Sequence, residues 1–122
     1  MACTPEHPLC LVIGDWRRIQ LTYRAKTTEV GISLTGSTFD FRLSERLSDG
    51  IIGNNVWSWT SGTETTNFDL TDLANGVIAL LILTTNSDDL DSTKKYVGQL
   101  RRISGGQPIT MCFFDVTAKA RP

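Results

Sequence analysis

The sequence is poor in the residues on which most catalytic and metal sites depend. It holds one histidine, His7, and three cysteines, none of them in a C-x-x-C pair. A histidine-based zinc site and repeated acid–base use of imidazole are therefore not expected, and a Ser–His–acid triad would have to recruit His7. The glycine-rich patterns that cradle phosphates, G-x-x-x-x-G-K-S/T and G-x-G-x-x-G, are also missing. We expect no enzymatic activity, no catalytic residue and no cofactor.

The sequence has three cysteines, which are too few for a disulfide scaffold and cannot all be paired within one chain. Cys3, Cys10 and Cys112 cannot all pair within one chain, so an even disulfide framework is excluded. A Cys3–Cys10 bridge stays open. Cys112 lies between Met111 and Phe113, and we interpret it as a small core residue. This pattern favours folding in a reducing compartment.

The chain also has no excess of positive charge and no long apolar run. It carries 12 Lys and Arg against 13 Asp and Glu, so it lacks the basic footprint typical of nucleic-acid binding. The longest apolar run, residues 77–83, spans seven residues, whereas crossing a bilayer takes roughly 20. The first twelve residues contain no basic residue, which argues against a secretory signal. Neither nucleic acid nor membrane is an expected partner.

What the sequence does contain is typical of β-strands. Val, Ile and Thr number 6, 9 and 16 among 122 residues, and these types favour strands. Apolar and polar residues alternate over residues 17–24 and 38–43, the two-residue period of a half-buried strand. Residues 56–60 fit another strand, and residues 77–83 fit a central strand that follows the turn signal Asn75-Gly76. Residues 96–103 and 108–117 predict a hairpin joined by residues 104–107.

These elements predict one domain built as an antiparallel β-sandwich. Six or seven short strands with turn signals about every ten residues are typical of two packed sheets. We expect the sandwich over residues 11–118, between an N-terminal tail (1–10) and a C-terminal tail (119–122). One short helical turn is predicted near residues 86–93, capped by Asn86 or Ser87, with Asp88 and Asp89 near its positive end. Those acidic residues lack the spacing of a calcium loop, so no metal site is predicted.

Seven residues stand out as interface candidates. Trp57 and Trp59 share one side of a strand, and with Phe68 they fit a buried core, a protein interface or a sugar-binding platform. In the pairs Arg17-Arg18 and Arg101-Arg102, neighbours point to opposite faces, so we expect one of each in a salt bridge or subunit contact. The candidates are Trp57, Trp59, Phe68, Arg18, Arg102, Asp88 and Asp89.

Charge is distributed unevenly along the chain. Residues 47–93 contain no Lys or Arg and seven acids, while the flanking stretches carry all 12 basic residues against six acids. Such a division could let one copy dock its acidic part on the basic part of a neighbour. Alternatively, the two parts interleave on the surface and their charges cancel locally.

Several short motifs, taken in order, resemble one known family. They are Gly14-Asp15-Trp16, Ile32-Ser33-Leu34-Thr35-Gly36 before the strand at 37–43, Ala74-Asn75-Gly76-Val77-Ile78-Ala79-Leu80, and Lys95-Tyr96-Val97-Gly98-Gln99-Leu100 before a glycine turn and a closing strand at 109–117. This order resembles the immunoglobulin-like N-terminal domain of phage baseplate upper proteins. Members of this family have no catalytic residues, so the resemblance implies none in this chain.

The resemblance implies a virion structural protein that is assembled in the host cytoplasm. We expect a tail or baseplate adaptor that contacts other virion proteins and forms a homo-oligomer within a symmetric assembly. A capsid cement protein that clamps shell subunits is the alternative of the same class. A host-surface carbohydrate-binding module, resting on Trp57 and Trp59, is the alternative of another class.

Overall fold

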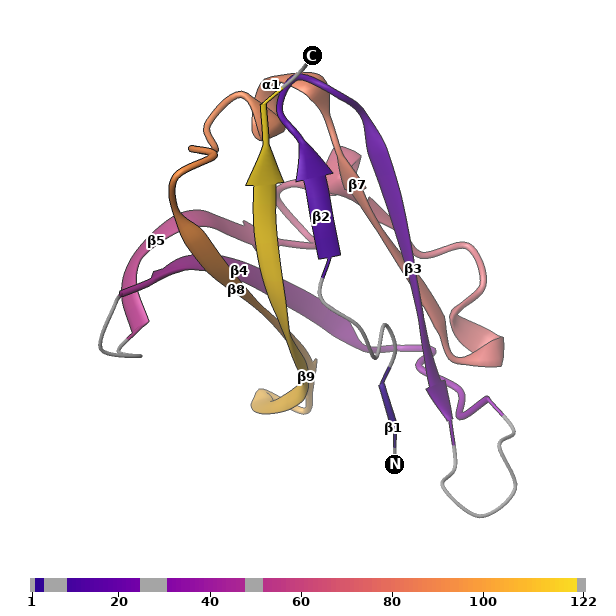
Figure 1. The fold of residues 1–122 in the computed structure, drawn as a ribbon. Helices are drawn as coiled ribbons and strands as arrows, with labels where there is room; N and C mark the ends of the chain where they lie inside the picture. Colours follow the sequence, from indigo (N-terminus) through magenta and orange to yellow (C-terminus); the bar gives the residue numbers. More distant parts are fainter. Residues whose placement is uncertain (1, 4–8, 25–30, 48–51, 121–122) are drawn as a thin grey trace.

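The computed structural model describes the chain apart from residues 1, 4–8, 25–30, 48–51 and 121–122. The described part is dominated by β-strands in two sheets that pack face to face (Figure 1). The predicted all-β sandwich is therefore confirmed.

The first sheet has four strands in the order β1-β3-β7-β6, and all neighbours are antiparallel. Its strands are β1 (Ala2–Cys3), β3 (Arg17–Arg24), β7 (Val77–Ile82) and β6 (Phe68–Asp69). β7 lies between two partners, as expected for a central strand. The turn before it needs Gly76, whose φ is 75° and where a Cβ would lie 2.6 Å from two backbone carbonyl oxygens.

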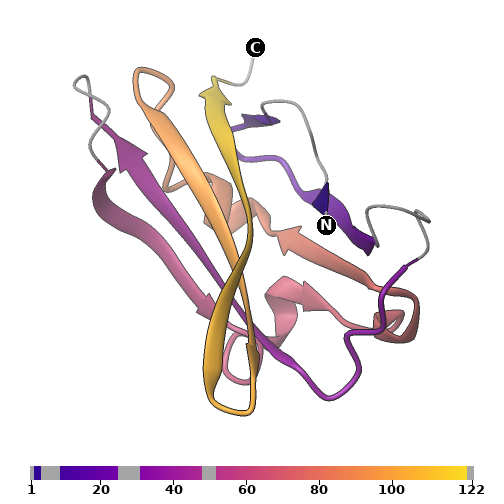
Figure 2. The same ribbon diagram turned by 90° about the horizontal axis from the view of Figure 1, so that it is seen from below.

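The second sheet has five strands in the order β2-β9-β8-β4-β5. They are β2 (Leu9–Val12), β9 (Gln107–Lys119), β8 (Lys95–Ser104), β4 (Thr38–Arg46) and β5 (Ile52–Thr60). β2 runs parallel to β9, and the other neighbours are antiparallel. β8 and β9 form the predicted hairpin, a twisted ribbon coloured orange to yellow in Figure 2.

The strand order is that of an immunoglobulin-like sandwich. In that fold one sheet has the order A-B-E-D, and the other contains C, F and G, with C′ added in the variable type. Here β1, β3, β7 and β6 correspond to A, B, E and D, and β9, β8, β4 and β5 correspond to G, F, C and C′. β2 is an additional strand at the edge beside β9. The Tyr96 hydroxyl, at the start of β8, accepts a hydrogen bond from the Asp91 amide at 2.8 Å, which is the tyrosine corner of this fold. The described sheets contain nine strands rather than about seven, because β1 and β6 are two-residue strands.

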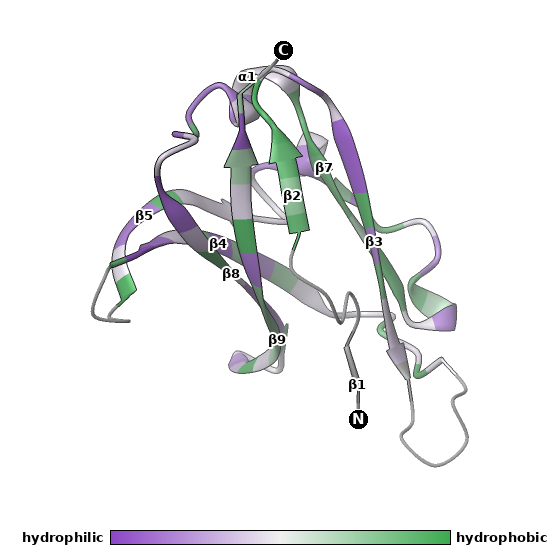
Figure 3. Ribbon diagram, viewed as in Figure 1, coloured by the Kyte–Doolittle hydropathy of each residue, from purple (hydrophilic) through white to green (hydrophobic). Residues whose placement is uncertain are grey.

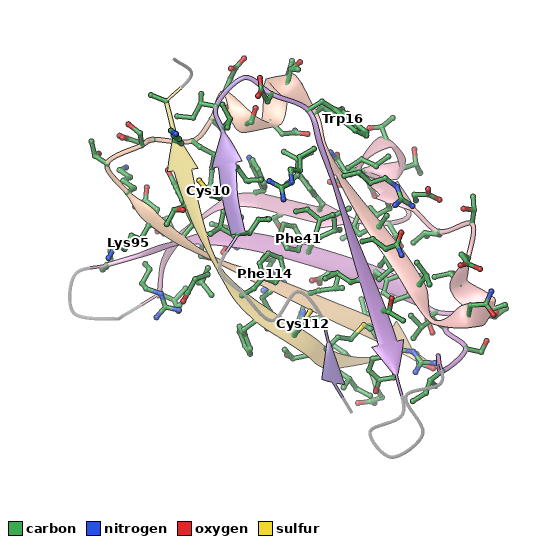
Figure 4. The ribbon with its side chains drawn as sticks, turned by 45° about the vertical axis from the view of Figure 1, so that its right-hand side comes forward. Cys10, Trp16, Phe41, Lys95, Cys112 and Phe114 are labelled. Carbon is green, nitrogen blue, oxygen red and sulfur yellow. The ribbon has the colours of Figure 1, made fainter. Side chains whose placement is uncertain are left out.

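The core fills the space between the two sheets. The Phe41 ring stacks on Phe114 with 5.9 Å between centroids and contacts Trp59 at 5.6 Å (Figure 4). Gly98 makes this stack possible, since a Cβ there would lie 2.9 Å from the Phe114 ring. The inner faces of β3, β7, β4 and β8 supply most other core side chains: Ile19, Leu21, Ile78, Leu80, Ile82, Phe39, Leu43 and Leu100. β2 is hydrophobic along its whole length (Figure 3).

Three short helical turns connect the strands: η1 (Thr65–Asn67), η2 (Leu73–Asn75) and α1 (Thr84–Ser87). α1 begins earlier than predicted, directly after β7, and Asn86 Oδ1 caps it by accepting the Leu83 amide at 3.0 Å. Asp88 and Asp89 follow its C-terminal end, so their predicted place at the positive end is wrong. The position of this turn is fixed by burial, because Ser87 is 0% and Leu90 6% exposed.

The cysteines and the chain ends also differ from the prediction. Cys112 is disulfide-bonded, whereas Cys10 is a free, exposed thiol. Cys112 is partly buried against the core, in line with its interpretation as a small core residue, but it is disulfide-bonded rather than a free thiol. The Cys3–Cys10 bridge is excluded, and the cysteines no longer argue for a reducing compartment. β2 begins at Leu9 and β9 ends at Lys119, so the sandwich reaches past both expected boundaries. His7 lies outside the described residues.

Candidate interaction surface

The aromatic residues selected from the sequence lie in the core. Trp57, Trp59 and Phe68 are 4%, 6% and 6% exposed. The two indole rings stack on each other at 4.8 Å on the inner face of β5. Neither a sugar-binding platform nor a surface contact can use rings at this depth, so core burial is the interpretation that the structure supports.

The charged candidates do not meet at one place. Arg18 Nη2 lies 3.2 Å from Asp69 Oδ2 on the outer face of the four-stranded sheet. Arg102 is half-buried and donates from Nε to Ser37 Oγ at 2.7 Å. Residues 88–89 are exposed at the end of α1. The structure therefore separates these residues instead of combining them into a site.

A different surface, the outer face of the five-stranded sheet, emerges from the strand register. Paired residues point to the same side of a sheet, so the register arranges the outer side chains of β9, β8, β4 and β5 in four rows. The rows are Thr110–Arg101–Asp40–Thr60, Phe113–Gln99–Arg42–Ser58, Asp115–Val97–Ser44–Asn55 and Thr117–Lys95–Arg46–Ile52. They contain four cations and two carboxylates, a net charge of +2. We call these four rows the basic face.

Asp40 organises one end of the basic face. Its side chain is 7% exposed and accepts two hydrogen bonds from Arg101, one from Nε at 3.1 Å and a second, short one from Nη2. Arg42 Nη2 lies 3.9 Å from the same carboxylate. The hydrogen bond to Asp40 raises the pKa of Arg101 above its ordinary value. A bidentate contact of this kind fixes the guanidinium in one orientation.

A salt bridge covers the other half of the face. Arg46 Nη2 and Asp115 Oδ1 are 2.9 Å apart and close over Val97, which is only 6% exposed although it lies on the outer face. Beside this bridge is a hollow of about 300 Å³, lined by Arg46, Lys95, Tyr96, Asp115, Val116 and Thr117. Lys95 is exposed and has no ion-pair partner within the described part of the chain.

Phe113 is the most exposed apolar side chain of the basic face. It is 63% exposed, the largest value among the large hydrophobic side chains that the structure describes. Its neighbours in the rows are Gln99 and Asp115. The sequence contained a signal that we did not use: in a strand, adjacent residues point to opposite faces. With Phe114 in the core, Phe113 has to face outward.

A second exposed group lies at the end of the sandwich near α1. The buried Ser87 hydroxyl accepts the Gly14 amide at 2.9 Å and donates to the Asp15 carbonyl at 3.1 Å. These bonds hold the β2–β3 turn against α1, and Trp16, the next residue, is 55% exposed (Figure 4). Within the described residues, Asp88 and Asp89 make no ion pair. We call Trp16, Asp88 and Asp89 the acidic tip.

Several backbone groups of the two outermost strands of the five-stranded sheet already have partners outside the sheet. On β5, the Thr60 amide donates to Glu64 Oε2 at 3.1 Å, and its carbonyl accepts the Glu64 amide at 2.8 Å. On β2, Arg17 donates to the Cys10 carbonyl at 3.0 Å, and the Asp15 amide donates to the Val12 carbonyl at 3.1 Å. The pairing of β4 with β5 also shifts register twice between Leu43 and Arg46. Strand addition is therefore disfavoured at these positions.

The described residues form no metal-binding cluster. Within the described ranges, no three His, Cys, Asp or Glu side chains gather closely enough to hold a metal ion. None of the helices described is long and apolar enough to span a bilayer. No family model matches the chain, and no curated protein matches it either.

Proposed function

We propose that this chain is a non-enzymatic structural protein of a phage virion, acting in the tail or baseplate as an adaptor or assembly module. Its partners would be other virion proteins and further copies of itself, and its location the virion. The observation that carries the role in assembly is the basic face, where an exposed phenylalanine shares one face of a sheet with three arginines and a lysine.

The composition of this face is that of a protein-binding surface. Aromatic residues and arginine are enriched where proteins meet, and an exposed ring surrounded by polar groups is a common anchor. Asp40 holds Arg101 in position before any partner arrives, which lowers the entropy lost on binding. The phage part of the proposal rests on the ordered motifs from Gly14-Asp15-Trp16 to the closing strand.

A capsid cement protein remains the alternative within the same class, since a flat face could equally clamp shell subunits. The carbohydrate-binding alternative has lost its support, because it depended on Trp57 and Trp59 being accessible and both are buried.

The test is binding of gold-labelled protein to isolated tails and to empty heads of the phage that encodes it, imaged by negative stain. Decoration of tails supports the adaptor, and decoration of heads supports the cement protein. Phe113→Ser should abolish the decoration. Leu47→Ser, which removes a 45% exposed leucine outside the four rows, should leave it intact. Binding to neither particle would overturn the proposal.

A further inference from the structure

The basic face and the acidic tip are complementary in charge and in apolar character. The face offers Phe113, the ammonium of Lys95, which has no ion-pair partner among the described residues, and a net charge of +2. The tip offers Trp16 and the exposed carboxylates of Asp88 and Asp89, which form no ion pair within the described part of the chain. The two surfaces are therefore opposite in charge, and each carries an exposed aromatic ring.

Charge decides which surfaces of two copies can meet. Two basic faces packed on each other would bring a net charge of +2 against a net charge of +2, and like net charges facing each other across an interface oppose association. Pairing a tip with a face instead brings Asp88 and Asp89 against Lys95 and Arg42. The indole of Trp16 can then pack on the Phe113 ring or over a guanidinium.

We propose that copies of this chain bind one another by docking the acidic tip of one copy on the basic face of the next. The proposal rests on the assembly role proposed above and names its partner, a second copy. Because the two surfaces differ, a pair of copies joined by one such contact still has one free face, on the first copy, and one free tip, on the second. Further copies can therefore add through the same contact. The assembly ends when a ring closes, of which a two-fold dimer is the smallest, or it continues as a filament.

The contact should be weak. A turn docked on a flat sheet buries less than the roughly 1,600 Å² of a standard interface. Its charges are exposed, so added salt should weaken it further. We expect association that depends steeply on concentration and that becomes extensive only where many copies are held together.

Light scattering across a concentration range tests the proposal with two double variants. The tip variant is Trp16→Ser with Asp89→Lys, and the face variant is Phe113→Ser with Lys95→Gln. The wild-type mass should rise above the monomer value of 13.5 kDa, while each variant alone stays monomeric. Mixed together, the two variants should form one-to-one dimers and nothing larger, because only one productive tip–face pair exists between them. Near-ultraviolet circular dichroism checks that both are folded.

The matched control is Leu47→Ser with Asp72→Lys, which removes one exposed apolar side chain and reverses one exposed carboxylate elsewhere. It should assemble like the wild type. A wild type that stays monomeric at every concentration would overturn the proposal, and so would unchanged assembly of the tip or face variant, or mixed species above a dimer. If a monomeric protein still decorates phage particles, the docking inference fails and the proposed function survives. If the protein assembles through tip and face but decorates no phage particle, the docking inference survives and the proposed function fails.

Discussion

At the scale of single residues, the core is tightest around one position without a side chain. Gly98 leaves the space into which the Phe114 and Phe41 rings fit, with ring atoms 2.9 and 3.2 Å from where its Cβ would be. In antibody domains the residue two positions after the corner tyrosine is a disulfide cysteine. Here aromatic stacking occupies the same part of the core.

Gly98→Ala should therefore destabilise the fold. The added methyl group is too close to the Phe114 ring, and relieving the overlap in a packed core typically costs about 1–3 kcal/mol. Urea denaturation measures the loss. Gly62→Ala is the control, because nothing lies within 4 Å of its Cβ position, and it should change the free energy of unfolding little. Equal losses in both variants would contradict the packing argument.

Tyr96→Phe tests the corner that joins β8 to the preceding loop. The change removes the acceptor of the Asp91 amide and leaves that donor without its partner. We expect a loss of about 1–3 kcal/mol in the free energy of unfolding. Tyr23→Phe is the control, since the Tyr23 hydroxyl makes no hydrogen bond among the described residues. A stable Tyr96→Phe protein would show that the bond contributes nothing net.

At the scale of elements, the alternation of polar and apolar residues predicted where strands lie. It did not predict strand pairing or the start of α1, which depend on contacts between residues far apart in the sequence. The strands at residues 17–24 and 38–43 were predictable because successive side chains of a strand point to opposite faces, and polar and apolar residues alternate there with the same two-residue period. The pairing of β2 with β9 was not, since Leu9 and Val116 are far apart in sequence and meet only through the sheet. The start of α1 was missed for the same reason, because the contacts of Ser87 fix it.

In the candidate interaction surface too, the local sequence pattern predicted little, because most of the surface depends on tertiary contacts. Nothing in the local pattern distinguishes an inward tryptophan from an outward one, so Trp57 was open to three interpretations until its burial was known. The basic face depends on the register of four strands, which no single segment specifies. Only Phe113 could have been found early, from its position beside Phe114.

The turn between β8 and β9 gives a prediction for an element. Gly105 and Gly106 have φ of 60° and 78°, the positive values that a type I′ turn requires at both central positions. Gly105→Asn should leave the free energy of unfolding nearly unchanged, because asparagine tolerates this conformation. Gly105→Val should lower it by about 1–2 kcal/mol, the usual cost of a left-handed backbone for a residue with a Cβ. Thermal unfolding of both variants checks this, and identical midpoints would contradict it.

At the scale of the whole molecule, stability should depend on acid-sensitive carboxylates. Hydrogen bonds from the Thr71 side chain and amide, with Arg18 contributing, lower the pKa of Asp69. Thr93 lowers the pKa of Asp91 in the same way. A carboxyl whose pKa is lower in the folded state contributes stability above its unfolded pKa, here near 3.8. That contribution is lost as the pH falls through the folded value.

The free energy of unfolding should therefore fall as the pH drops from 5 toward 2. Replacing both threonines, Thr71→Val with Thr93→Val, should flatten that decline, because their hydroxyls no longer favour the charged carboxylates. Thr85→Val, at an exposed position of α1, should leave the pH profile as it is in the wild type. Urea unfolding at several pH values measures the slopes. A double variant with the wild-type slope would show that these bonds play no part.

The partnered backbone groups at the two sheet edges have a consequence for the chain at high concentration. Stacked strands grow into fibrils by adding chains to open backbone edges, and here Glu64 occupies that position on β5 and Arg17 occupies it on β2. Crowding many copies together should then seed cross-β polymer less readily at these two positions. In a dense array the side-chain surfaces would have a larger part in deciding how neighbours arrange themselves.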